Sequence, residues 1–307
     1  MSTGPTGVVV MAYGTPAHPD EIEAYYTHIR RGRPPTTEQL ANLTARYDAL
    51  GGTSTLAART RDQVASITSA LEQRAPGRYL VRLGQKHASP FIEDAVGGLA
   101  DDGATRIVGL VLAPHYSGAS VGEYQARAAE AAEAAGNAGG LPFAPIERWH
   151  DEPSYRDFLG AAVRDALAGM PESTEVVFTA HSLPERVLAG DPYPDELWES
   201  AEAVARTAGL DPTRFSQAWQ SAGATPEPWR GPDILDVIRD TAASGRSEAI
   251  LVCPQGFVAD HLEVAYDLDI EAAAVARSAG IGFARTRVLN DDPVVMAALA
   301  ERIVAIS

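Results

Sequence analysis

The stretch VVFTAHSLP, residues 176–184, is an apolar run that ends in a histidine and then turns at a proline. It matches VVVMAYGTP, residues 8–16, at an offset of 168 residues, and Tyr13 stands where His181 stands. Short apolar runs bounded by turns are typical of buried strands. The match therefore indicates two similar halves, each with a strand that delivers a polar side chain from its carboxyl end.

A second pair of segments points to the same duplication. VLAPHYSGASVGE, residues 111–123, and LVCPQGFVADHLE, residues 251–263, align Glu123 with Glu263 at an offset of 140 residues. Few identities support either match alone, and strand ends of unrelated α/β units can resemble one another by chance. Together the two matches favour a chain of two similar lobes.

Strands and helices are expected to alternate along the whole chain. Apolar runs predict strands at 7–13, 79–84, 106–113, 175–180, 215–220, 248–254 and 282–289. Apolar residues at helical spacing predict helices at 60–73, 120–136, 155–169 and 293–306. Strands that alternate with helices form parallel sheets covered on both faces, so the fold class is α/β and doubly wound.

The boundary between the lobes is expected near residues 147–155, which gives a first lobe over 1–150 and a second over 151–307. The final helix is expected to pack back on the first lobe. Open α/β sheets bind ligands outside the carboxyl ends of their strands. If the lobes face each other, Tyr13 and His181 approach one cleft from opposite walls.

Composition excludes several classes of protein. The net charge of −16 disfavours nonspecific binding to nucleic acid or to an anionic membrane. No apolar stretch is long enough for a transmembrane helix, and the first residues lack the features of a signal peptide, so we expect a cytoplasmic protein. Cys253 is the only cysteine and Lys86 the only lysine, so arginine supplies nearly all positive charge.

Carboxylates recur every four residues at Glu263, Asp267 and Glu271, which places them on one face of a predicted helix. A solvated helix face explains such a stripe, but like charges at this spacing destabilise a helix by about 0.2–0.5 kcal/mol per pair. A rail of carboxylates that leads to His181 would suit a hydrated divalent metal, and oxygen and imidazole ligands accommodate Fe(II).

A cluster of arginines is the second chemical feature. Arg30, Arg31 and Arg33 lie close together in YYTHIRRGRPP, and Arg46 follows in RYDALGGTS, which ends at Ser54. Arginines at the end of a helix are favourable in their own right. Three arginines within four positions of so acidic a chain favour an anion site. The Ser54 hydroxyl could donate a further hydrogen bond to a bound carboxylate. His87 and His115 follow strands and could also line a cleft.

Several long motifs resemble the ferrochelatases, in that family's order and over essentially the whole chain. They are MAYGTP (11–16), YYTHIRRGRPP (25–35), RYDALGGTS (46–54), KHASPFIEDAV (86–96), LAPHYSGASVGEY (112–124), AHSLPERV (180–187), GDPYPDEL (190–197), WQSAGATPEPWRGPD (219–233) and GFVADHLEVAYDLDIEA (256–272). The resemblance implies two Rossmann-like lobes, each with a parallel four-stranded sheet flanked by helices. It also implies insertion of Fe(II) into a porphyrin.

The same resemblance implies roles for individual residues. His181 and Glu263 would be the catalytic and metal-handling pair, with Asp267 and Glu271 as auxiliary carboxylates. Tyr13 is similar to the tyrosine of coproporphyrin III ferrochelatases and would lie axial to the iron. The positions that match porphyrin and propionate contacts are Tyr13, Arg30, Arg46, Tyr47, Ser54 and Tyr124.

No cofactor is expected beyond Fe(II) as a substrate. Some relatives carry a [2Fe-2S] cluster on several cysteines, which the lone Cys253 cannot form. We expect a monomer, and pathway logic suggests handover of the product to a coproheme decarboxylase. Whether His181 chiefly accepts a proton or delivers the iron stays open. The alternatives are a protoporphyrin IX ferrochelatase, a chelatase for another metal or tetrapyrrole, and a non-catalytic tetrapyrrole carrier.

Overall fold

The computed structural model describes residues 4–135 and 139–307, and the chain divides into two compact units. Unit 1 comprises Met1–Ala113, Gly118–Trp149 and Asn290–Ser307. Unit 2 comprises Pro114–Ser117 and His150–Leu289. The chain thus passes between the units several times, and the final helix belongs with the first unit.

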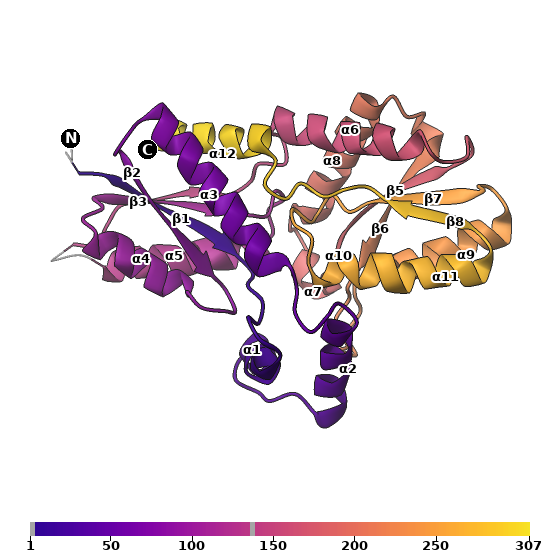
Figure 1. The fold of residues 1–307 in the computed structure, drawn as a ribbon, viewed down its shortest axis with the longest axis horizontal. Coiled ribbons are helices and arrows are strands. Elements are labelled where there is room, and N and C mark those ends of the chain that lie inside the picture. The colour runs from indigo at the N-terminus through magenta and orange to yellow at the C-terminus, as the bar shows by residue number, and fades with distance from the viewer. Residues whose placement is uncertain (1–3, 136–138) are drawn as a thin grey trace. The chain divides into compact units, whose positions relative to one another are not determined.

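Unit 1 is built on a parallel sheet of four strands in the order β2-β1-β3-β4. The strands are β1 (Thr6–Ala12), β2 (Tyr79–Gln85), β3 (Arg106–Val111) and β4 (Phe143–Ile146). Figure 1 shows one face covered by α3 (Leu56–Arg74) and α12 (Pro293–Ile306), and the other by α4 (Ile92–Asp101) and α5 (Glu123–Ala134). A further pair of helices, α1 (Ile22–Ile29) and α2 (Thr37–Asp48), packs together after β1.

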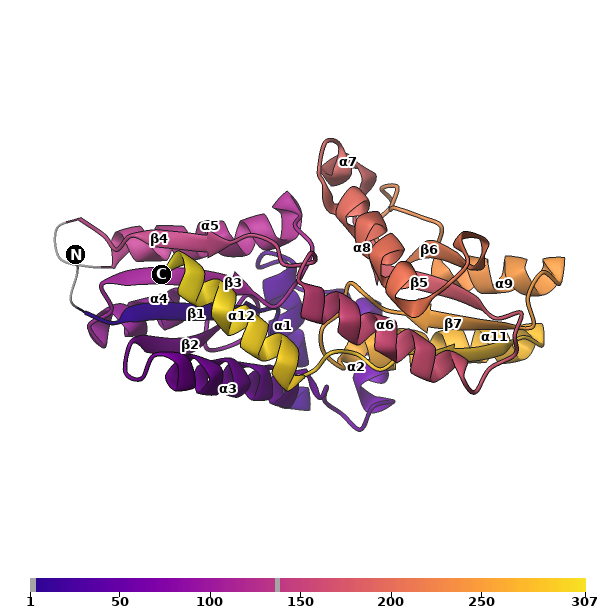
Figure 2. The same ribbon diagram turned by 90° about the horizontal axis from the view of Figure 1, so that it is seen from above.

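Unit 2 repeats this plan with the order β6-β5-β7-β8, again all parallel. Its strands are β5 (Glu175–His181), β6 (Phe215–Gln220), β7 (Ala249–Cys253) and β8 (Gly282–Arg285). The helices α6 (Pro153–Leu167) and α8 (Tyr193–Ala208) pack together, and so do α9 (Ile234–Ser244) and α11 (Ala273–Ala279) (Figure 2). Short helices occur at α7 (Glu185–Leu188) and α10 (Leu262–Ala265).

The two sheets share one strand order, which confirms the predicted pair of doubly wound four-stranded sheets. Strands β1 and β5 occupy equivalent positions, and so do β3 and β7. In each sheet the connections run outward in opposite directions from these two strands, so the strand order reverses between them. Such a reversal is the place where open α/β sheets bind ligands. The segments that follow β1 and β3 in unit 1, and β5 and β7 in unit 2, are therefore the candidate site segments.

Every strand expected from the sequence is present, although the last one ends at Arg285 rather than at residue 289. The pattern missed β4, whose sequence FAPI contains Pro145. Proline lacks a backbone N–H and is tolerated in edge strands, and β4 lies at the edge of its sheet. The helix expected at 120–136 begins as a π-helix over Gly118–Gly122 and continues as α5, and its last predicted residue lies outside the described residues.

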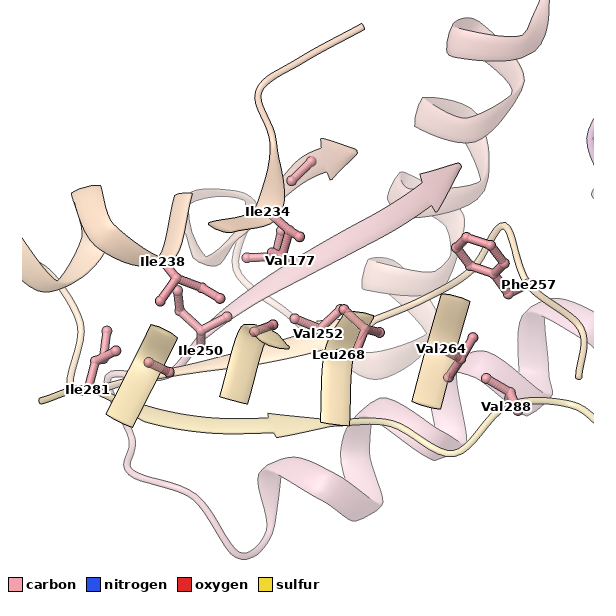
Figure 3. Packing of buried hydrophobic residues seen from close by; sticks show 13 residues of the cluster. Val177, Ile234, Ile238, Ile250, Val252, Phe257, Val264, Leu268, Ile281 and Val288 are labelled. Carbon is pink, nitrogen blue, oxygen red and sulfur yellow. The ribbon is translucent and has the colours of Figure 1, made fainter. Parts of the chain in front are cut away.

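A buried apolar cluster holds the sheet of unit 2 against its helices (Figure 3). Ile250 and Val252 of β7 pack in this cluster with Ile238 of α9 and Leu268 of the helical segment that follows α10. All four side chains are fully buried, and each such burial stabilises the fold by about 1.5–3 kcal/mol. The cluster thereby fixes the segment that follows β7. Within residues 4–135 and 139–307, every helix is too short or too polar to cross a lipid bilayer.

Candidate functional site

His181 is the last residue of β5, at the switch point of unit 2. Glu263 lies in α10, after β7 on the other side of that switch point. The His181 Nε2 atom is 3.6 Å from Glu263 Oε1, and 35% of each side chain is exposed. The structure therefore brings the two residues together, with both groups accessible to a ligand.

The second ring nitrogen of His181 fixes the orientation of the ring. Nδ1 lies 2.5 Å from the carbonyl oxygen of Ser182, so Nδ1 is the protonated nitrogen that donates this bond. In the neutral ring, Nε2 then carries the lone pair and points to Glu263. Burial lowers the pKa of His181, but the carboxylate of Glu263, with smaller help from the Ser182 carbonyl and the charge of Asp267, outweighs burial and raises the pKa to about 9. Without a metal, the pair holds a proton at neutral pH.

Gln220, which no sequence motif singled out, ties this site together. The buried side chain accepts a hydrogen bond from Thr179 Oγ1 at 2.8 Å and donates one to the Glu263 carbonyl at 2.7 Å. It thus links β5 to the segment that carries Glu263. The sequence signal was its place at the end of a strand, inside the motif that begins at Trp219, and a glutamine there can equally serve only to stabilise the fold.

Gly256 brings the segment after β7 into contact with β5. Its backbone N–H donates to the carbonyl of Thr179 at 3.1 Å. A Cβ at position 256 would lie 2.6 Å from the Cβ and 2.9 Å from the Cα of Ala180, the residue before His181. Only glycine allows this approach without displacing the strand.

The predicted carboxylate stripe does not lie on a regular α-helix. Residues Asp267–Ala272 form a π-helix, in which the Glu271 N–H donates to the carbonyl of Tyr266, five residues earlier. Asp267 is buried and accepts a hydrogen bond from Ser221 Oγ. Glu271 lies near a different carboxylate, Asp233. Burial raises the pKa of Asp233, and the charge of Glu271 raises it further. The carboxylates therefore lie on a helical segment whose middle is a π-helix, and Asp267 and Glu271 have different neighbours. That they form a rail leading to His181 stays a prediction. Single π-turns are frequent at functional sites.

His261 begins α10, where its Nδ1 atom accepts the N–H of Glu263 at 3.0 Å. Burial lowers the pKa of His261, so its ring is neutral and serves as an N-cap. In the described part of the chain, no three side chains of His, Cys, Asp or Glu form a group that could hold a metal ion. The pair His181 and Glu263 is therefore an open arrangement of two groups rather than a closed metal cage.

Tyr13 directly follows β1, at the switch point of unit 1, and its side chain is exposed. Its ring lies 4.7 Å from that of His87, whose Nδ1 is 2.9 Å from His28 Nδ1. Burial and the adjacent charge of Lys86 lower the pKa of His87 to about 3. A neutral His87 imidazole therefore lies beside Tyr13. That Tyr13 and His181 meet across a cleft stays a prediction.

The predicted propionate contacts lie in the helices and turns that follow β1. Arg30 caps α1 and lies over the ring of Tyr26 at 5.7 Å, and Arg46 is in the last turn of α2. Ser54 Oγ accepts the N–H of Leu56 at 3.1 Å, at the start of α3. A hollow of about 540 Å³ beside α1 is lined by none of these predicted contacts.

Two further predicted porphyrin contacts are largely buried. Only 2% of Tyr47 and 4% of Tyr124 is exposed. The Tyr47 hydroxyl is 3.2 Å from Thr15 Oγ1. Neither ring is exposed enough in this structure to stack on a flat ligand.

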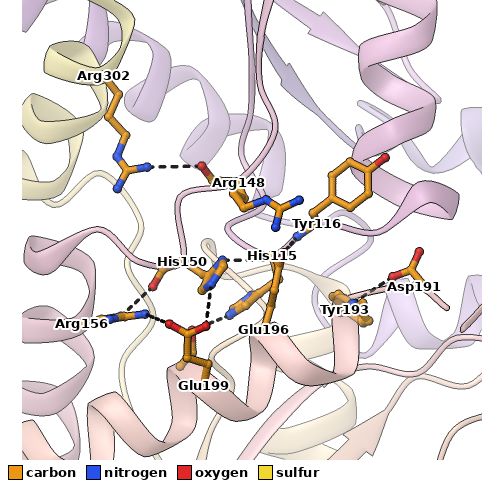
Figure 4. A network of polar contacts seen from close by, with 11 residues as sticks. His115, Tyr116, Arg148, His150, Arg156, Asp191, Tyr193, Glu196, Glu199 and Arg302 are labelled. Carbon is orange, nitrogen blue, oxygen red and sulfur yellow. Dashed lines mark hydrogen bonds and ion pairs between the residues drawn. The ribbon is translucent and has the colours of Figure 1, made fainter. Parts of the chain in front are cut away.

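His115 does not line a cleft, contrary to the expectation from its place after a strand. It is buried in unit 2, with Nε2 2.9 Å from Ser200 Oγ and its ring stacked on that of His150 at 5.4 Å (Figure 4). Glu196 accepts the N–H of Tyr116 at 2.7 Å and lies 3.3 Å from His150 Nδ1. These contacts hold the short segment 114–117 on α8, which is a structural role.

Comparison with known proteins places the chain beside metal chelatases. The family model described as ferrochelatase matches residues 5–305. The chain is 44% identical to coproporphyrin III ferrochelatase of Geobacillus kaustophilus, with 96% of this chain and 93% of the relative covered. It is also 44% identical to the coproporphyrin III ferrochelatase of Bacillus subtilis, covering 98% and 97%. A solved structure of SirB from Bacillus subtilis with Fe3+ has the same fold, with a TM-score of 0.56 at 11% identity over 98% of this chain and 95% of SirB.

Proposed function

Because the chain belongs to the ferrochelatase family, we propose that it inserts Fe(II) into coproporphyrin III, releasing two protons and forming coproheme for haem biosynthesis. The names of the relatives at 44% identity support this choice of porphyrin. The observation that carries the proposal is the pair His181 and Glu263, whose Nε2 and Oε1 atoms lie 3.6 Å apart at the switch point of unit 2. Imidazole and carboxylate are ligands that suit Fe(II).

His181 and Glu263 handle both the iron and the protons in this proposal. The metal-free pair holds a proton, since the pKa of His181 is about 9, and Fe(II) must displace that proton to bind Nε2. Fe(II) then replaces two pyrrole protons, so the charge balances. Imidazole and carboxylate can accept these protons one at a time as the iron leaves them.

The first unit binds the porphyrin. Coproporphyrin III carries four propionates, which need local positive charge in a chain of net charge −16. Binding of the propionates away from the ring centre can drive the bending of the ring that exposes the pyrrole nitrogens. Tyr13 would lie axial to the iron of the product. The proposed porphyrin contacts are Tyr13, Arg30, Arg46, Tyr47, Ser54 and Tyr124, with Asp267 and Glu271 as auxiliary carboxylates for iron.

We propose a cytoplasmic monomer that passes coproheme to a decarboxylase. A [2Fe-2S] cluster needs several thiolates. The chain has one cysteine, and burial raises the pKa of the Cys253 thiol to about 12. The proposed enzyme therefore works without such a cluster.

An anaerobic insertion assay with Fe(II) tests the proposal. Coproporphyrin III and protoporphyrin IX are each supplied to the protein, and the absorption change of metallation is followed. We expect faster turnover with coproporphyrin III. H181A should abolish insertion while porphyrin binding persists, and H18A, at an exposed histidine, should retain insertion.

Each other outcome contradicts a separate part of the proposal. Faster turnover with protoporphyrin IX would overturn the choice of porphyrin. Binding of both porphyrins without metallation would indicate a carrier. Retained turnover in H181A would overturn the role of the histidine.

A further inference from the structure

Lys86 is the only lysine among 25 basic residues, and it is only 7% exposed. Lysines are almost never buried without a partner. In a chain that otherwise uses arginine for positive charge, this position holds a compact ammonium group where the wider guanidinium would need more room. The contacts of this buried side chain show what the ammonium group can bind.

The backbone of Lys86 is fixed at the carboxyl edge of the sheet of unit 1. Its N–H donates to the carbonyl of Ala12 at 2.9 Å, one residue before Tyr13. Its carbonyl accepts a hydrogen bond from Arg127 Nη1 at 3.0 Å, and Arg127 also makes two hydrogen bonds to Glu93, at 2.7 and 2.8 Å. The backbone of Lys86 is therefore fixed through both its N–H and its carbonyl.

The side chain of Lys86 meets one carboxylate and one aromatic ring. Nζ donates to Glu123 Oε2 at 2.8 Å and lies 5.0 Å from the centre of the Tyr124 ring. An ammonium group has three hydrogens to donate, and the described residues offer it this one hydrogen-bond acceptor. The Glu123 side chain is 42% exposed, whereas that of Lys86 is 9% exposed. Glu123 thus covers the ammonium from the solvent side.

The place of Glu123 in the fold points to a ligand. It begins α5 directly after a π-helix, at the switch point of unit 1, as Glu263 follows β7 at the switch point of unit 2. In unit 2 the carboxylate faces an imidazole. In unit 1 an ammonium group already neutralises the carboxylate, so this position is suited to an anion rather than to a metal cation.

We propose that Lys86 is a further binding residue for a propionate of the porphyrin, and that Glu123 holds its place until the porphyrin arrives. The inference rests on the proposed function. A propionate carries the same carboxylate group as Glu123, so exchange keeps the buried ammonium paired throughout and avoids the cost of an isolated buried charge. The half-exposed Glu123 side chain is released to water. Lys86 and Glu123 would then favour porphyrins that carry more carboxylates.

Binding of metal-free coproporphyrin III to the full chain, followed by porphyrin fluorescence, tests the inference. K86M should raise the Kd about tenfold, which is typical of losing one hydrogen bond to a charged group. E123Q should lower the Kd, by about threefold, because a competing charge has gone. The double variant K86M/E123Q should have the same Kd for coproporphyrin III as K86M, since neither protein has an ammonium group for a propionate to bind.

Two controls separate this exchange from a merely structural role. R82M removes the 2.8 Å ion pair between Arg82 of β2 and Asp102, which involves neither Lys86 nor Glu123, and should leave the Kd unchanged. K86Q is neutral but can still hydrogen-bond to Glu123, so it repeats the test if K86M unfolds. Thermal unfolding of each variant checks its fold.

Weaker binding by E123Q, or wild-type binding by a folded K86M or K86Q, would overturn the inference. The Kd is measured without iron. A wild-type protein that binds the porphyrin but does not metallate it would therefore refute the proposed function and leave this inference standing. A wild-type protein that binds no porphyrin would overturn both.

Discussion

Replacing Glu263 with glutamine should lower the pKa of His181 in the metal-free protein. The variant keeps the size of the side chain and removes its charge, which lies 3.6 Å from His181 Nε2. In the wild-type protein burial opposes the charged ring and Glu263 favours it, with the result that the pKa is about 9. In E263Q the opposing effect of burial remains, and only the smaller effects of the Ser182 carbonyl and Asp267 still favour the charged ring.

The size of the effect can be bounded from the distance. Two unit charges 3.6 Å apart interact by about 4.6 kcal/mol at an effective dielectric constant of about 20 and by about 1.2 kcal/mol in water. These energies correspond to about 3 and about 1 pKa units. Because 35% of each side chain is exposed, solvent screens the pair and the result should lie between these limits. We therefore expect the pKa of His181 to fall by about 1 to 3 units.

A histidine titration by two-dimensional NMR measures this value. The chain has seven histidines, and the signal of His181 is identified by its loss in H181N. An E263Q protein in which the pKa of His181 stays at its wild-type value would refute the assigned pairing. The stability that this pair contributes is fully present below pH 6.5 and is lost as the pH rises through about 9, so E263Q should also lose this alkaline dependence of unfolding.

Three other predictions follow from single contacts. G256A should destabilise the fold by about 1–3 kcal/mol in urea unfolding, because its Cβ would lie 2.6 Å from the Cβ of Ala180; insertion should fall as well, and a neutral G256A would contradict the close approach. G97A is the matched control, since a Cβ there meets nothing within 4 Å, and it should be neutral or stabilising. Burial lowers the pKa of His115 well below 6.5, so the folded protein should lose about 1.4 kcal/mol per pH unit as the pH falls below about 6.5. H115Q should reduce this slope without changing it above pH 7, and an unchanged slope in unfolding curves at pH 5 to 8 would exclude the assignment. Q220L should cost about 1–3 kcal/mol by removing two buried hydrogen bonds and should raise the KM for iron, whereas an unchanged KM would show that this glutamine does not position the site.

The fold could be predicted from local pattern because parallel strands buried on both faces are continuous apolar runs. The strand β5 is an example, with Val176, Val177 and Phe178 fully buried. The edge strand β4 could not be recognised, because it is short, half-exposed and interrupted by Pro145. Its pairing with β3 is a tertiary contact that leaves no periodic signal in four residues.

Some features of the candidate site could be predicted from the sequence, and others could not. The pairing of His181 with Glu263 was expected from the resemblance to the ferrochelatases, and the structure brings the two side chains together at one switch point. The surroundings of Asp267 could not be predicted. A spacing of four residues predicts a regular helix, and it gives no sign of a π-turn or of a hydrogen bond from Ser221. The burial of Tyr124 could not be predicted either, since aromatic residues occur both in cores and at binding sites.

Local sequence patterns predicted the alternation of strands and helices apart from β4, the similarity of the two halves, and the residue types available at each switch point. Those features depend on neighbours along the chain, so local periodicity is enough to specify them. Which charges meet depends on the packing of segments that lie far apart in the chain. Glu263 and Glu123 occupy equivalent places, yet one faces the imidazole of His181 and the other the buried ammonium of Lys86. These partners come from distant segments, and only the packing of the sheets brings them within contact distance.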